Sequence, residues 1–171
     1  MKNLTTPVCK FLMIFRQSIL ILILIVASPV FSADYEKGVD ASLRGDFKTA
    51  FKEWKTLAEL GGATSQFQVG WLYKEGKGVT KNYETAVKWY RLAAEQGYAY
   101  AQSALGRMYE DGYGVSQNYI YAYMWFSVAA SQWDKDAVKM LDKATKYLTT
   151  DQLKTAQELA RECVRKKYNG C

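Results

Sequence analysis

Two stretches of the sequence combine a glycine pair with charged side chains, a pattern that can bind phosphate or calcium. They are "GWLYKEGKGVTKNY" at residues 70–83 and "GRMYEDGYGVSQNY" at residues 106–119. A phosphate loop needs a preceding strand and usually the pattern G-x-x-x-x-G-K-[ST]; a helix is expected before both stretches, and neither contains the pattern. A calcium loop needs several oxygen ligands, and Glu75, Glu110 and Asp111 are too few. We therefore interpret both stretches as turns that need backbone freedom between antiparallel helices.

Other residue patterns suited to catalysis are equally sparse. The chain contains no histidine, which excludes Ser-His and Cys-His arrangements, and no serine has a lysine three residues later. Glu75, Glu110 and Asp111 could work as paired carboxylates, but solvated surface positions explain them better. We expect no catalytic residue, no cofactor and no metal site. A cell-wall-related enzyme is the remote alternative.

The N-terminal part of the chain differs from the rest. Three basic residues precede an apolar run at residues 19–27, and no acidic residue occurs before Asp34. This layout predicts a secretory signal peptide at residues 1–33. The alternative is an uncleaved membrane anchor, because the uncharged run at residues 17–33 reaches the short limit for a membrane span. Either would export the domain, to the periplasm of a bacterium or out of the cell.

The net charge is partly a property of that leader. The full chain carries 23 basic and 17 acidic residues, and removing the three basic residues of the leader leaves 20 minus 17, or +3. This excess is mild and scattered, whereas a nucleic-acid partner would need basic residues clustered on one face. We expect no nucleic-acid partner.

Two cysteines remain after the leader, Cys163 and Cys171. In an oxidising compartment an even pair at this spacing predicts a disulfide, and two free thiols are the alternative. A metal site is disfavoured because the chain offers no histidine, and no further cysteine after the leader, as a ligand.

The glycine stretch occurs twice because the chain contains a repeat. Residues 63–98 and 99–134 share 14 identities in 36 positions, and a period in the thirties is typical of a solenoid of helical hairpins. Apolar residues in each copy fall at helical spacing before the glycine loop and again after it. The sequence therefore predicts an all-α solenoid.

The repeat also predicts the boundaries of the units. We expect a degenerate first repeat at residues 34–61, full repeats at 62–97 and 98–133, and a helical C-terminal cap at 134–171. Asp46 lies 36 residues before Asn82, which suggests that both begin the second helix of a hairpin. In the cap, Thr149 and Gln152 have the spacing of a capping box.

Two glycines fall inside the predicted helices. Gly70 and Gly106 occupy equivalent positions of the two copies, and glycine costs about 1 kcal/mol relative to alanine within a helix. We expect a close approach of two helices as the compensation, with Ala86 and Ala122 as the small partners.

The repeated pattern, AxxQxxxGxxYxxGxGVxxNYxxAxxW(Y/F)xxAA, resembles the Sel-1-like repeat, a relative of the tetratricopeptide repeat. The resemblance covers residues 35–131 well and the cap weakly. It implies a right-handed α-solenoid of helical hairpins that acts as a non-catalytic adaptor and binds other proteins along a concave face.

The groove spacing of the tetratricopeptide repeat, transferred to this chain, implies a binding groove on the first helix of each hairpin. Its residues are Tyr35, Val39, Ser42, Thr64, Phe67, Trp71, Lys74, Tyr100, Ser103, Arg107 and Glu110. Exposed Trp, Tyr and Arg together are typical of binding hot spots. The alternative is that Phe67 and Trp71 merely pack against a neighbouring unit.

The function predicted from the sequence is an exported, non-catalytic protein-interaction module, periplasmic or secreted. Its partner would be a protein or peptide of the cell envelope. We expect no small-molecule substrate, and membrane contact only if the leader stays uncleaved. The alternative is an envelope-structural protein that contacts peptidoglycan or a membrane assembly.

Overall fold

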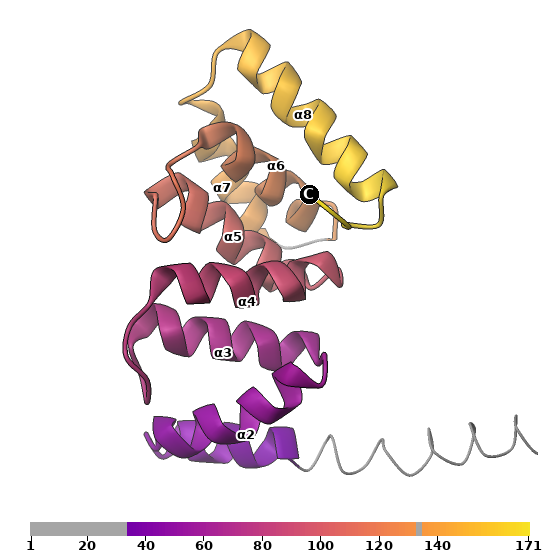
Figure 1. Cartoon of the computed structure of the whole chain (residues 1–171). Helices are drawn as coiled ribbons and strands as arrows, with labels where there is room; N and C mark the ends of the chain where they lie inside the picture. Colours follow the sequence, from indigo (N-terminus) through magenta and orange to yellow (C-terminus); the bar gives the residue numbers. More distant parts are fainter. Residues whose placement is uncertain (1–33, 133–134) are drawn as a thin grey trace, which may run out of the picture.

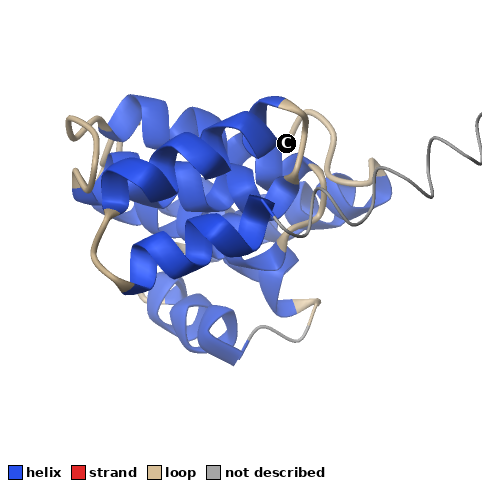
Figure 2. Ribbon diagram, turned by 90° about the horizontal axis from the view of Figure 1, so that it is seen from below, coloured by secondary structure: helices blue, strands red, loops and turns tan. Residues whose placement is uncertain are grey.

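The described part of the chain is helical throughout. The computed structural model describes residues 34–132 and 135–171, which form helices and connecting loops without a strand (Figures 1 and 2). The helices are residues 34–43, α2 (Phe47–Glu59), α3 (Ala63–Glu75), α4 (Tyr83–Glu95), α5 (Ala99–Asp111), α6 (Tyr119–Ala130), α7 (Lys135–Thr145) and α8 (Thr150–Arg165). The predicted all-α class is confirmed. The predicted leader at residues 1–33 lies outside the described residues.

The helices stack one after another as a solenoid (Figure 1). Helices adjacent in sequence pack against each other from α2 and α3 to α6 and α7, whereas α8 lies against α6. None of the described helices is both long and apolar enough to cross a membrane.

Each second helix of a hairpin begins at a side chain that caps it. Asp46, Asn82 and Asn118 are the N-caps of α2, α4 and α6, at intervals of 36 residues. Each side-chain oxygen accepts a hydrogen bond from a backbone N–H three residues later, at 2.8–3.1 Å and so satisfies one of the unpaired donors of the first turn. The correspondence predicted between Asp46 and Asn82 is confirmed.

The glycine loops turn the chain and also join neighbouring repeats. The first glycine of each pair ends its helix in the left-handed conformation, with φ of 70° at Gly76 and 73° at Gly112. The second glycine lies on the backbone where the previous hairpin's second helix begins. A Cβ atom at Gly78 would be 2.3 Å from the Phe47 carbonyl oxygen. Both glycines are therefore required by packing and backbone conformation, and the interpretation as turns is confirmed.

The glycines within helices lie beneath aromatic rings. A Cβ atom added at Gly70 would be 2.7 Å from the ring of Tyr90, and one added at Gly106 would be 2.5 Å from the ring of Phe126. The close approach of helices is confirmed. The Ala86 carbonyl oxygen lies 3.3 Å from the Cβ atom added at Gly70, so Ala86 is a neighbour as predicted, although the ring is nearer.

The first hairpin contains the same contact, which the sequence comparison missed. A Cβ atom at Gly38 would be 2.3 Å from the indole nitrogen of Trp54. Trp54, Tyr90 and Phe126 lie 36 residues apart and are all nearly fully buried. The connection within this first hairpin is shorter, so that Gly38 falls out of the 36-residue register.

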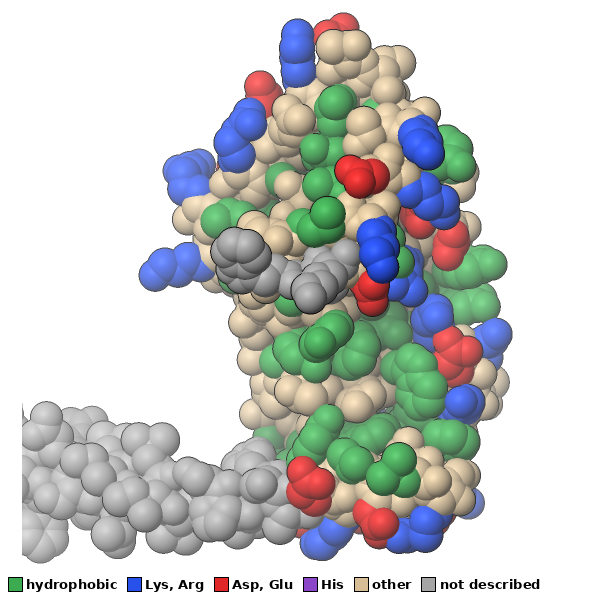
Figure 3. Space-filling view, turned by 180° about the vertical axis from the view of Figure 1, so that it is seen from behind, with side chains coloured by type: hydrophobic (Ala, Val, Ile, Leu, Met, Phe, Trp, Pro, Cys, Tyr) green, Lys and Arg blue, Asp and Glu red, His purple; other side chains and the backbone are tan. Residues whose placement is uncertain are grey.

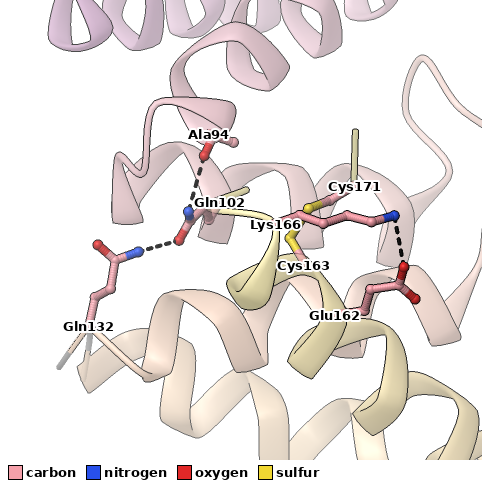
Figure 4. The surroundings of a disulfide bond; sticks show 7 residues. All are labelled: Ala94, Gln102, Gln132, Glu162, Cys163, Lys166 and Cys171. Atoms are coloured by element: carbon pink, nitrogen blue, oxygen red, sulfur yellow. Dashed lines mark hydrogen bonds and ion pairs between the residues drawn. A yellow bond between two sulfur atoms is a disulfide. The ribbon is translucent and has the colours of Figure 1, made fainter. Parts of the chain in front are cut away.

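Buried glutamines link the hairpins. The Gln102 side chain donates to the Ala94 carbonyl oxygen at 3.1 Å and accepts from Gln132 at 2.7 Å (Figure 4). Gln66 makes the equivalent pair of hydrogen bonds 36 residues earlier. Because a buried amide without partners would be costly, these hydrogen bonds favour one stacking arrangement.

The C-terminal cap has both predicted features. Thr149 and Gln152 form a reciprocal capping box at the start of α8. Cys163 and Cys171 form a disulfide with a Cα–Cα distance of 5.4 Å, which joins α8 to the chain that returns from it (Figure 4).

We expect Gly106→Ala to lower the free energy of unfolding by about 1–2 kcal/mol. Alanine gains about 1 kcal/mol of helix propensity, but its Cβ would overlap the buried Phe126 ring, and overpacking costs about 1–3 kcal/mol or more. Urea denaturation measured by circular dichroism gives the difference. In a Phe126→Leu background the same substitution should cost less; an equal cost in both backgrounds would contradict the contact.

Candidate protein-binding site

A pocket of about 250 Å³ opens between α3 and α5. Most of its lining comes from these two helices, and α4 and the start of α7 add one residue each. The lining residues are Phe67, Trp71, Lys74, Tyr90, Tyr100, Ser103, Ala104, Arg107 and Asp136. The molecule seen from behind shows hydrophobic side chains gathered over the first repeats, with charged side chains around the edges of the view (Figure 3).

Six of the eleven residues of the predicted groove line this pocket: Phe67, Trp71, Lys74, Tyr100, Ser103 and Arg107. All but Tyr100 lie three residues before, one after or four after the glycine within their helix. Residues three before, one after and four after a position lie on one face of a helix, and this face flanks Gly70 on α3 and Gly106 on α5. The glycine contact therefore fixes which side chains reach the pocket.

Glu110 has the same register but does not line the pocket. It is 8% exposed, and its Oε1 lies 3.0 Å from the Lys143 Nζ of α7. This carboxylate raises the pKa of Lys143 through a hydrogen bond and its charge. The ion pair joins α7 to the end of α5.

The other predicted groove residues lie elsewhere. Tyr35 and Val39 pack in the core of the first hairpin, where the Tyr35 ring lies 6.1 Å from that of Trp54. Ser42 is half-buried on the same helix, and Thr64 is half-buried beside Tyr98. The structure thus brings the α3 and α5 parts of the predicted groove together without the first helix.

Three lining residues were not predicted: Tyr90, Ala104 and Asp136. Tyr90 occupies a repeated aromatic position, which gave a signal for the core rather than for the pocket. Asp136 belongs to the degenerate cap, where the repeat register is lost, and no sequence signal places it there.

An aromatic cluster forms the wall of the pocket at one end. The Phe67 ring centroid lies 5.6 Å from that of Tyr90, 5.4 Å from that of Tyr98 and 6.4 Å from that of Tyr100. Tyr100 itself is 63% exposed. At the other side Trp71 packs against Phe47. Phe67 and Trp71 therefore both pack between units and line the pocket. The predicted groove position and the alternative of packing against a neighbouring unit are thus compatible.

The charges at the pocket are mixed, and most are paired. Lys74 contacts Glu75 at 2.7 Å, and this hydrogen bond lowers the pKa of the Glu75 carboxyl. Asp136 lies 3.8 Å from Lys139. Arg107 is exposed, and its Nε donates to the Met140 sulfur at 3.1 Å. Arg107 thus brings a guanidinium group to the pocket, which Asp136 also lines.

Within the described residues, no group of three or more His, Cys, Asp and Glu side chains is placed to hold a metal ion. The lining of the pocket offers aromatic contact combined with a guanidinium group, which suits recognition of another molecule.

Tyr90 is the most strongly perturbed of these lining residues. Burial raises the pKa of its phenol well above the ordinary value of 10.0. The folded protein thus keeps a proton that the unfolded chain releases. The contribution of Tyr90 to the free energy of unfolding is fully present below about pH 10. It is lost as the pH rises further, by up to roughly 1.4 kcal/mol per pH unit.

We expect Tyr90→Phe to flatten this alkaline loss of stability. Urea denaturation at several pH values between about 9 and 11 measures the slope. Tyr147→Phe is the matched control, since Tyr147 is 53% exposed and should leave the slope unchanged. A slope in Tyr90→Phe equal to that of the original protein would show that Tyr90 does not contribute.

Comparisons with known proteins agree with this architecture. The Sel1 repeat matches residues 63–98 and 99–132. No curated protein sequence matches the chain. Helicobacter pylori cysteine rich protein B (TM-score 0.53) is 20% identical, with 67% of this chain and 97% of that one aligned, and shows the fold alone.

Two solved structures are more similar in sequence. One is c5321, described as a protective antigen in uropathogenic Escherichia coli strains that displays an SLR fold (TM-score 0.77, 30% identity). It aligns with 81% of this chain, which spans only 30% of its length. The other is a Sel1 repeat protein from Oxalobacter formigenes (TM-score 0.61, 32% identity), with 74% of this chain and 98% of that one aligned. Sel1 repeat proteins are typically protein-interaction scaffolds. From its repeats, its helical stack and these relatives, the chain belongs to the Sel1 repeat family.

Proposed function

We propose that this chain is an exported, non-catalytic interaction module that binds a peptide segment of a partner protein in the pocket between α3 and α5. The observation that carries the proposal is the meeting of Trp71, Tyr100 and Arg107 at one pocket. Trp, Tyr and Arg are the residue types most enriched in binding hot spots.

The size of the pocket favours a side chain as its occupant. Pockets for drug-sized ligands measure about 300–1,000 Å³, and this one measures about 250 Å³. One large apolar side chain of a peptide suits the space better than a cofactor would. Because the Phe67 ring is held by three tyrosines, little ordering entropy is lost when the side chain enters.

Arg107 favours an acidic group on the partner peptide next to that side chain. Its Nε is held by Met140, while the neighbouring charges Lys74, Asp136 and Glu110 all have partners of opposite sign. A carboxylate on the partner would complete the pairing through a charge-assisted, bidentate hydrogen bond. The preferred segment therefore carries an acidic residue near its apolar anchor.

Two features support export of the module to a bacterial periplasm or the cell exterior. The basic and then apolar residues before Asp34 have the layout of a signal peptide. The Cys163–Cys171 disulfide fits an oxidising compartment. A partner in the cell envelope follows from this location.

We expect Arg107→Glu to weaken binding of a pocket-directed peptide by about tenfold or more, equivalent to about 1.4 kcal/mol. The probe is the strongest binder selected from a displayed random-peptide library on the oxidised protein, measured by fluorescence anisotropy. Lys88→Glu is the matched control, because it makes the same change of charge at an exposed position on α4.

Tyr100→Ala should also weaken this peptide, whereas Tyr147→Ala, at a similarly exposed tyrosine, should not. Circular dichroism checks that each variant is folded. Equal affinities of the Arg107→Glu and Lys88→Glu variants would place the peptide elsewhere and overturn the assignment of the pocket.

Export is tested by the mass of the protein recovered from the cell that makes it. We expect a chain in the periplasmic or secreted fraction that begins near Asp34. A full-length chain in the membrane fraction would indicate the anchor instead, and a full-length chain confined to the cytoplasm would contradict export.

A further inference from the structure

The chain beyond α8 forms a closed loop with an unusual backbone. Cys163 is 2% exposed and bonds to Cys171, and the Tyr168 N–H donates to the Cys163 carbonyl oxygen at 2.9 Å. Lys167 and Tyr168 have φ of 52° and 68°. Two consecutive non-glycine residues in this left-handed region are disfavoured, so the conformation persists only where the surroundings impose it.

The loop places the Tyr168 ring on the junction between α4 and α5. A Cβ atom at Gly97 would lie 2.9 Å from Cε2 of Tyr168. Gly61, at the equivalent position of the preceding junction, has no atom within 4 Å of such a Cβ. The α2–α3 junction is therefore open, whereas the α4–α5 junction is covered by a residue that lies far along the chain.

The covered junction leads directly to the pocket. Tyr98 follows Gly97, and its ring packs against Phe67 at 5.4 Å and against Tyr100 at 5.6 Å between centroids. Tyr98, Tyr168 and Cys171 all pack on the same buried cluster. Figure 4 shows the disulfide beside Gln102 and Ala94, whose hydrogen bond ties the start of α5 to the end of α4.

From these contacts we infer that Tyr168, held by the Cys163–Cys171 disulfide, is a positioning residue for the pocket. By covering Gly97 it restricts the one glycine at this junction, whose φ is 85°. The restriction keeps Tyr98 against Phe67 and Tyr100, and thus keeps the aromatic wall in the shape that binds the peptide. This inference rests on the proposed function of the pocket.

Contact alone does not establish that the C-terminal loop and the pocket are coupled. Coupling requires an element with two states whose equilibrium depends on both regions. The loop supplies that element, because Tyr168 either lies on Gly97 or is released from it. Release should increase local opening at the α4–α5 junction and leave the α2–α3 junction unchanged, since no part of the loop covers Gly61.

Hydrogen–deuterium exchange of the whole chain tests the first step. In the oxidised protein, Tyr168→Ala should raise the exchange rate of backbone amides at residues 97–102 about fivefold or more and leave residues 61–66 unchanged. Tyr168→Phe keeps the ring and should behave like the original protein. Cleavage of the disulfide with a phosphine reductant should reproduce the effect of Tyr168→Ala.

The second step is measured with the peptide selected on the oxidised protein. Tyr168→Ala should weaken its binding about fivefold or more, and Tyr168→Phe should restore it. Unchanged affinity in Tyr168→Ala, or exchange that rises equally at both junctions, would overturn the inference while leaving the pocket assignment intact. If no peptide depends on Arg107, the proposed function fails and the positioning role falls with it, whatever the exchange data show.

Discussion

The fold depends on one repeated contact, in which a glycine within a helix lies beneath an aromatic ring of the next helix. The pairs are Gly38 with Trp54, Gly70 with Tyr90 and Gly106 with Phe126. Without a Cβ atom the ring lies directly on the backbone, so the two helices of each hairpin come close together and turn in a fixed register. That register decides which side chains of α3 and α5 remain available at the surface.

Much of the fold could be predicted from the sequence because the same pattern of residues occurs in two copies of the repeat. The N-caps at Asp46 and Asn82, the glycine turns and the Thr149 capping box follow from local chemistry, and all are observed. The aromatic rings over the helical glycines could not be predicted, because a glycine in the sequence does not show which side chain of the neighbouring helix lies nearest to it.

The candidate site likewise could be predicted only in part. The groove spacing of the tetratricopeptide repeat, transferred to this chain, selected Phe67, Trp71 and Arg107, which do line one pocket. Spacing could not show that α7 would cover Glu110 and contribute Asp136, because the cap has lost the repeat register and its position depends on tertiary packing. The same limit applies to Tyr168, whose contact with Gly97 joins two segments without any shared sequence pattern.

The central claim is that a partner segment occupies the pocket beside Tyr100. Site-specific photocrosslinking in the cell that makes the protein tests it most directly, with benzoylphenylalanine placed at Tyr100 or, as a control, at Tyr113, which is 43% exposed and outside the pocket. The account predicts a defined protein crosslinked from position 100 through a segment that contains an acidic residue, and none from position 113. Crosslinking from position 113 but not from position 100 would contradict it.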